Sequence, residues 1–292
     1  MNRMNRRASI GWMLAAVLAF AVFDALTKYL AAIYPVVFLV WARYLIHTLV
    51  AVAVFFPAHG GAMFRSQRMG AQVVRGLLML GVSLCMMNGA KYLPLAELTS
   101  LYFTAPLIAT VLTFFFLKEK VSGRVWGTTF MGVIGVLLIT RPGHGDFELS
   151  WLLPLMAALL YAGFQIFTRM FATTENPVVT NVMTGGVGAM VMSFVVPFFW
   201  SVDSMSFEVK HIILLGALGL SGFLAQFMLI KAYEGGSPAS LAPFSYTQLV
   251  WSAVIGFLVF GAEPSLFALS GMLVIMAGGV YVILGSRGMG RR

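Results

Sequence analysis

The chain has 292 residues, of which 60% are hydrophobic and only 10% are charged. A soluble domain carries roughly 25% charged residues, so this composition excludes a soluble globular enzyme and predicts that most of the chain faces lipid. The formal net charge of +9 does not indicate a nucleic-acid partner, because the basic residues lie in short clusters between long apolar runs, as membrane topology requires.

Apolar runs of about 18 residues or more can cross a hydrocarbon core roughly 30 Å thick. We predict ten such transmembrane helices, and no loop between them is long enough to fold as a separate catalytic or nucleotide-binding domain. In chain order they cover approximately residues 9–30, 36–56, 71–90, 94–117, 124–140, 150–170, 177–200, 211–232, 238–260 and 266–285. The predicted fold class is therefore all-α, an integral membrane protein.

The first run is open to a second interpretation. It follows an arginine-rich start and contains Ala19-Phe20-Ala21, which together imitate a cleavable signal peptide. Cleavage would leave nine spans and place the new N-terminus on the wrong side for the charges of the loops. We therefore predict that the first run stays in the protein as a helix.

Basic residues between the runs predict the orientation in the membrane. With the N-terminus in the cytoplasm, the other side holds only four of them, Lys28, Lys91, Arg141 and Lys210. The cytoplasmic side then collects Arg3, Arg6, Arg7, Arg65, Arg68, Arg75, Lys118, Lys120, Arg124, Arg169, Lys231, Arg287, Arg291 and Arg292. By the positive-inside rule we expect a multi-pass protein of the inner (plasma) membrane, with both termini and a basic tail at 286–292 in the cytoplasm.

The sequence repeats itself at a shift of 144 positions, without a gap. The shift superposes Pro94 on Pro238, Tyr102 on Tyr246, Phe116 on Phe260, Glu119 on Glu263, Gly127 on Gly271 and Gly135 on Gly279. We predict two five-helix repeats, residues 1–141 and 150–285. Because five is odd, the second repeat must enter the membrane from the opposite side, which is a recurring plan of secondary transporters.

Residues 89–141 read GAKYLPLAELTSLYFTAPLIATVLTFFFLKEKVSGRVWGTTFMGVIGVLLITR. An opening with alanine and proline, a helix with a proline in mid-span, a glutamate at the cytoplasmic end and a glycine-rich closing helix follow in this order. The stretch resembles the repeat unit of the drug/metabolite transporter superfamily, EamA type, and residues 232–284 are similar but more divergent. The resemblance implies a ten-helix fold and transport, often efflux, of amino acids, related metabolites or drugs.

Charges inside the hydrocarbon are costly and usually face the bundle interior or a wet cavity, and on this ground we single out four ionisable side chains of the predicted spans. Asp24 lies about 9 Å below the outer end of its helix, and Arg43 about 12 Å deep on the next. We expect Arg43 to bind a carboxylate, either on the substrate or, as a structural pair, on Asp24, which Lys28 could also partner. His47 and Glu97 suit a proton relay, with packing of His47 and solvation of Glu97 as the alternatives.

Uncharged polar and aromatic residues at mid-depth extend this predicted cavity. We expect it to be lined by Trp41, Tyr102, Tyr246, Gln165 and Gln248, and each of them can also be explained by packing between helices. Two prolines interrupt corresponding helices of the two halves, which is the best pointer in a sequence to a transport site. These helix interruptions are Pro106 and Pro243.

Motifs for other chemistries are missing from the sequence. It has no HExxH, cysteine cluster, GxxxxGK[ST] or GxSxG, so we predict no catalytic residues, metal or cofactor. We predict a secondary transporter, an exporter of small organic metabolites such as amino acids or drugs, that works by alternating access. A flippase for lipid-linked substrates and a membrane-embedded lipid-modifying enzyme, with Asp24, His47 and Glu97 as acid and base, stay open. The expected partners are a small-molecule substrate and membrane lipids but not nucleic acid, and the sequence leaves a homo-oligomer open.

Overall fold

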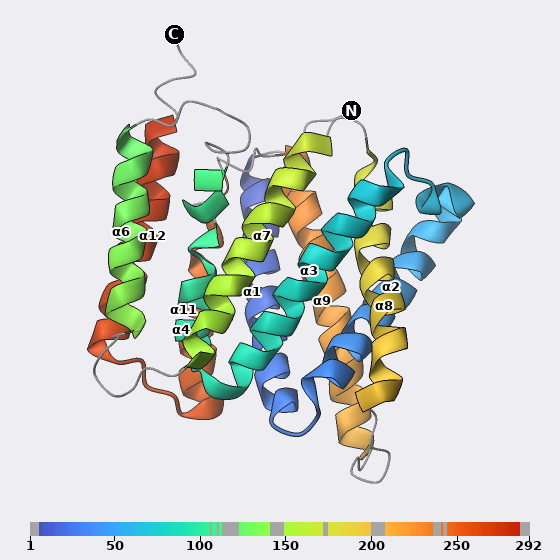
Figure 1. The fold of residues 1–292 in the computed structure, drawn as a ribbon, viewed down its shortest axis with the longest axis horizontal. Helices are drawn as coiled ribbons and strands as arrows, with labels where there is room; N and C mark the ends of the chain where they lie inside the picture. Colours follow the sequence, from blue (N-terminus) through green and yellow to red (C-terminus); the bar gives the residue numbers. More distant parts are fainter. Residues whose placement is uncertain are drawn as a thin grey trace.

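The computed structural model describes residues 6–105, 107–109, 111–112, 123–140, 149–171, 175–199, 208–235, 241 and 244–286. Within these ranges every regular element is a helix (Figure 1). The elements are α1 (Arg6–Ala31), α2 (Val36–His59), η1 (Gly60–Phe64), α3 (Met69–Tyr92), α4 (Leu95–Tyr102), α6 (Gly123–Thr140), η2 (Leu149–Trp151), α7 (Leu152–Phe171), α8 (Pro177–Phe199), α9 (Val209–Gly235), α11 (Thr247–Phe260) and α12 (Leu266–Ser286).

Each predicted span contains one of these helices. Six of them, α1, α2, α3, α7, α8 and α9, are long and apolar enough to cross a membrane by length and composition. Shorter apolar helices occupy the other predicted spans. Lipid leaves backbone groups no partner except the helix itself, which is why apolar runs of this length fold as helices. The prediction of an all-α membrane protein is confirmed.

The helices of the two halves make the same pattern of contacts. Taking α1, α2, α3, α4 and α6 as counterparts of α7, α8, α9, α11 and α12, the contact of α1 with α9 corresponds to that of α7 with α3. The contacts of α2 with α8, α4 with α11 and α6 with α12 each join a helix to its own counterpart, so exchanging the halves leaves them unchanged. In Figure 1, α1 runs downward and α7 upward. This is the arrangement of two inverted halves around a pseudo-twofold axis.

Helices α6 and α12 form one edge of the molecule (left in Figure 1) and touch at two glycines. A Cβ atom added to Gly271 would lie 2.6 Å from the carbonyl oxygen of Gly135. A Cβ atom added to Gly135 would lie 2.9 Å from the carbonyl oxygen of Gly271. No side chain fits at such distances, so the close approach of the two backbones requires glycine at both positions.

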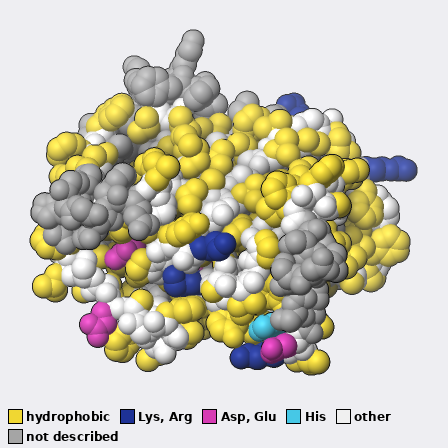
Figure 2. Space-filling model, turned by 60° about the horizontal axis from the view of Figure 1, so that its bottom comes forward, with side chains coloured by type: hydrophobic (Ala, Val, Ile, Leu, Met, Phe, Trp, Pro, Cys, Tyr) yellow, Lys and Arg dark blue, Asp and Glu magenta, His cyan; other side chains and the backbone are white. Residues whose placement is uncertain are grey.

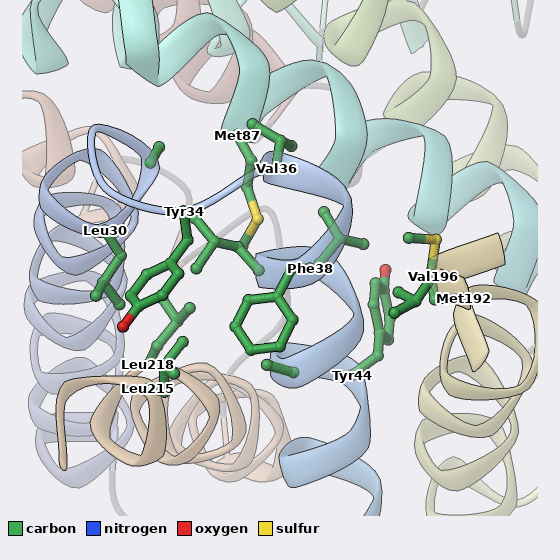
Figure 3. Packing of buried hydrophobic residues seen from close by; sticks show 14 of the residues in the cluster. Leu30, Tyr34, Val36, Phe38, Tyr44, Met87, Met192, Val196, Leu215 and Leu218 are labelled. Carbon is green, nitrogen blue, oxygen red and sulfur yellow. The ribbon is translucent and has the colours of Figure 1, made fainter. Parts of the chain in front are cut away.

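The largest buried apolar cluster joins the two halves near the connection between α1 and α2 (Figure 3). Tyr34, Phe38 and Tyr44 lie there among aliphatic and methionine side chains of α3, α8 and α9. The rings of Tyr34 and Phe38 are 5.6 Å apart. This cluster fixes α2 between α8 and α9, and it therefore fixes the depth at which Arg43 enters the bundle.

Different polar contacts hold the connections at the two faces of the molecule. We call the face on which α1 begins the N-terminal face (top of Figure 1). There, Glu175 Oε1 accepts hydrogen bonds from Ser66 Oγ at 2.9 Å and from the Arg68 backbone N–H at 3.1 Å. At the opposite face, the Tyr34 hydroxyl lies 3.1 Å from His211 Nδ1. Both contacts join a loop between two helices to the start of a helix from the other half.

Candidate functional site

The candidate site lies in the interior of the bundle, and its acidic member is Asp24 on α1. The Asp24 carboxylate accepts a hydrogen bond from the Gln248 amide on α11 at 3.1 Å. Gln248 is buried. The structure thus brings together two of the predicted site residues from different halves of the chain, and it holds the carboxylate with an uncharged group.

The basic member is Arg43 on α2. Its Nη1 donates to the hydroxyl of Ser83 on α3, and Ser83 Oγ lies 2.9 Å from the Tyr44 hydroxyl. The guanidinium carbon stands 4.6 Å from the centre of the Phe23 ring and 5.0 Å from that of Tyr44. Arg43 is therefore held by a hydroxyl and two aromatic rings, contacts that leave part of its fork of five donors for a ligand.

Arg43 and Asp24 have different partners and form no ion pair with each other in the part of the chain that the structure describes. They do interact through their charges over a longer distance. Lys28, the other partner expected for Asp24, instead donates to the carbonyl oxygens of Ala90 at 3.1 Å and Leu93 at 2.7 Å. It thereby caps the last turn of α3, where a cation is favourable.

Aromatic rings from α4 and α7 form a wall beside these charges. The rings of Tyr102 and Tyr161 are 5.3 Å apart, and Tyr161 stacks on Phe164 at 5.7 Å. Tyr102 lies within reach of the charges of Asp24 and Arg43. The repeat mates Tyr102 and Tyr246 both touch the ring of Phe103, at 6.3 and 5.4 Å. Planar rings so placed can stack on a planar part of a ligand.

The other predicted residues lie apart from this centre or serve packing. Trp41 Nε1 donates to Ser193 Oγ on α8 at 3.0 Å, and the indole lines a cavity of about 420 Å³ with Ser193, Val196 and Pro197. His47 Nε2 lies 3.4 Å from Asn181 Oδ1, and its ring meets the Phe223 ring edge-on at 5.7 Å. These contacts fit the packing interpretation of His47.

The expectation that Glu97 is solvated is wrong, since the side chain is only 9% exposed. Its helix α4 buries every residue from Leu95 to Leu101 because it packs against α11 and α7. Gln165 is half-buried on α7. Pro106 and Pro243 lie outside the described residues.

Arg75, which the charge pattern assigns to the cytoplasmic side, is a buried side chain of the bundle and not a loop charge. It belongs to α3 and is only 4% exposed. Its Nε donates to Thr168 Oγ1 at 3.0 Å and its Nη1 to Gln72 Oε1 at 2.9 Å. Arg75 already lies inside the predicted span 71–90, but so close to its start that the charge pattern groups it with the loop charges. Gln72, one turn before Arg75, is the signal that could have identified a buried polar cluster.

Figure 2 views the molecule with the face opposite the N-terminal face brought forward. Lys and Arg side chains lie near its middle, with acidic side chains close by, on a surface that is otherwise largely hydrophobic or uncharged.

The bundle spans the membrane and holds unlike charges in its interior, each beside uncharged groups. Such an arrangement is typical of proteins that move polar molecules across lipid. Fold and site thus define a membrane transporter.

Comparisons with known proteins identify the kind of transporter. The EamA-like transporter family matches residues 7–141 and 149–284, and the chain belongs to this family. It is 28% identical over 274 residues to the S-adenosylmethionine uptake transporter of Rickettsia felis, covering 94% of this chain and 92% of that protein. It is 27% identical over 261 residues to the riboflavin transporter of Vibrio cholerae, covering 87% and 85%.

One further relative is also a transporter, and one solved structure shares the fold. The chain is 25% identical over 268 residues to the pseudopaline exporter CntI of Pseudomonas aeruginosa, covering 90% of this chain and 93% of that protein. A solved crystal structure with 19% identity shares the fold, with a TM-score of 0.69 over 98% of this chain and 99% of the other. The protein is a multi-pass membrane transporter of small molecules and not an enzyme, and the family resemblance seen in the sequence is confirmed.

Proposed function

We propose that this transporter carries metabolites that combine an amino-acid zwitterion with a planar ring, and that S-adenosylmethionine is such a substrate. The observation that carries the proposal is the pair of unlike charges, Asp24 and Arg43, each held by an uncharged partner. A substrate carboxylate would bind the Arg43 guanidinium, and a substrate ammonium would bind Asp24. A nucleobase ring would stack against Tyr102 and Tyr161.

The energetics favour such a ligand over the present contacts. A carboxylate is a charged acceptor that can take two parallel N–H bonds from the guanidinium fork, so it would outcompete the single Ser83 hydroxyl for Arg43. The ammonium and carboxylate of the amino-acid group cancel in charge, so only the sulfonium of S-adenosylmethionine adds net charge to the bundle interior. The faces of the Tyr102 and Tyr161 rings would stabilise that cation.

Transport by alternating access is supported by the exchange of helix contacts between the two halves. We place the protein in the inner membrane with both termini in the cytoplasm, on the charge asymmetry of the loops. The repeat boundaries, residues 1–141 and 150–285, and export as the net direction remain predictions. Flux measured separately into and out of loaded vesicles decides the direction.

The test is flux of radiolabelled S-adenosylmethionine in proteoliposomes. Arg43→Gln removes the guanidinium but keeps a polar side chain, and we expect it to lower flux at least about tenfold, the effect of losing one charged hydrogen bond. The matched control is Arg65→Gln, which removes an exposed loop charge and should leave flux unchanged. Absence of saturable flux in the wild-type protein, or full flux in Arg43→Gln, would refute the proposal.

Riboflavin is the second candidate, favoured by the aromatic wall and by the Vibrio cholerae relative. Its ring system is neutral and needs stacking more than a guanidinium. If riboflavin is the substrate, Arg43→Gln should retain most of the riboflavin flux in the same vesicles, whereas Tyr161→Ala should abolish it.

A further inference from the structure

A second guanidinium lies buried in the bundle, on the side of the N-terminal face. Arg75 is the seventh residue of α3, about 9 Å from the start of that helix. It bonds Thr168 of α7 and Gln72 of its own helix, and its guanidinium carbon stands 4.8 Å from the centre of the Phe164 ring. Gln72 in turn donates to Thr180 Oγ1 on α8 at 3.3 Å.

No described carboxylate lies within ion-pair distance of Arg75. Glu175 is the acid that interacts with it electrostatically, but the Glu175 carboxylate is engaged by Ser66 and by the backbone of Arg68. Among the described residues, Arg75 is held by a hydroxyl, an amide and a ring, which are uncharged groups like those around Arg43. If Arg75 only held helices together, an uncharged residue would do so at a smaller cost in free energy, because burial of an ion is costly.

The two arginines are connected by one helix and by one row of rings. Ser83, which binds Arg43, and Arg75 both belong to α3, eight residues or about 12 Å apart along its axis. Phe164, under Arg75, stacks on Tyr161. Tyr161 contacts Tyr102, which lies within reach of the Arg43 charge. A ring-bearing carboxylate could therefore keep a stacking surface along the whole distance between the two guanidinium groups.

We propose that Arg75 is a second carboxylate-binding station, which receives the substrate carboxylate after Arg43 as the molecule opens toward the N-terminal face. The identity of the transported ligand rests on the function proposed above, but the station itself requires only a carboxylate. As α3 and α7 separate there, the bond to Thr168 breaks and Nε becomes free. The carboxylate then replaces a neutral acceptor with a charged one, which is the stronger partner.

The experiment measures binding without transport. Purified protein in detergent is melted at increasing concentrations of sodium benzoate, with benzamide as the uncharged probe of the same shape and sodium chloride at equal ionic strength. In the Arg43→Gln protein, benzoate should still raise the melting temperature, whereas benzamide should not. Adding Arg75→Gln to Arg43→Gln should weaken the apparent benzoate affinity at least about tenfold. Adding Arg65→Gln instead, an exposed charge, should leave the affinity unchanged.

A variant that keeps Arg75 guards against loss of folding. Thr168→Val removes the acceptor of Nε, so in the Arg43→Gln protein it should tighten benzoate binding, whereas a purely structural Arg75 predicts lower stability with unchanged affinity. Loss of all benzoate stabilisation in Arg43→Gln, or unchanged affinity in Thr168→Val, would overturn the station. A normal benzoate response without S-adenosylmethionine flux would instead refute the substrate assigned above and leave the station standing.

Discussion

The contact between α6 and α12 predicts that a methyl group added at Gly271 destabilises the protein, because the two helix backbones touch there. In Gly271→Ala the new Cβ atom would lie 2.6 Å from the Gly135 carbonyl oxygen and 2.6 Å from Ile139 Cγ1. Ordinary contacts are about 3.5 Å or longer, so the two helices must separate by a large fraction of an ångström. We expect a loss of stability of about 1–3 kcal/mol, the usual range for overpacking a well-packed contact.

The assay is reversible unfolding of the purified protein in detergent or bicelles, followed by helical circular dichroism. Gly127→Ala is the matched control on α6, since no described atom outside the glycine's own stretch of helix lies within 4 Å of a Cβ added there. That variant should be neutral or slightly more stable, because alanine favours a helix over glycine by up to about 1 kcal/mol. Ile139→Ala should rescue Gly271→Ala only in part, because the carbonyl oxygen stays in place. Wild-type stability of Gly271→Ala would refute the close approach of α6 and α12.

Further predictions concern the site, a helix end and the topology. Arg43→Lys should restore only part of the S-adenosylmethionine flux lost in Arg43→Gln, because an ammonium cannot reproduce the bidentate fork, and initial rates in proteoliposomes measure this. Lys28→Met should lower stability by about 1–3 kcal/mol, measured by melting, because two carbonyl groups at the end of α3 lose their donor. In a Cys85→Ser background, Ser265→Cys should react with an impermeant maleimide in intact cells and Gln67→Cys only after lysis. The reverse labelling pattern would contradict the predicted orientation.

Much of the fold could be predicted from hydropathy and the internal repeat. Lipid forces each apolar run into a helix, so the runs alone locate α1, α2, α3, α7, α8 and α9 to within a few residues. The repeat is also visible in the sequence, because glycines and prolines mark special backbone positions that keep the register of the two copies. Which helix touches which could not be predicted, since hydropathy does not say which face of a helix meets a neighbour.

Only part of the candidate site could be predicted from the sequence. Asp24 and Arg43 could be singled out because charges inside an apolar run are rare and expensive. Their neighbours Ser83, Tyr44 and Tyr161 could not, because hydroxyl groups and rings are equally common where helices only pack. Glu97 shows a related limit, since its burial is decided by what packs against α4 and not by its distance from the end of the span.

The two contacts that hold the loops at opposite faces have a consequence for the balance between conformations. They occupy corresponding places in the two halves, yet one is a carboxylate with a hydroxyl and an amide, and the other is a tyrosine with a histidine. Under the alternating access proposed above, near-symmetric halves would otherwise populate inward-open and outward-open forms almost equally. A net hydrogen bond contributes about 1 kcal/mol, which changes a two-state ratio roughly fivefold. Unequal loop contacts can therefore set the resting bias of the transporter, and single substitutions in a loop can reverse it without touching the substrate site.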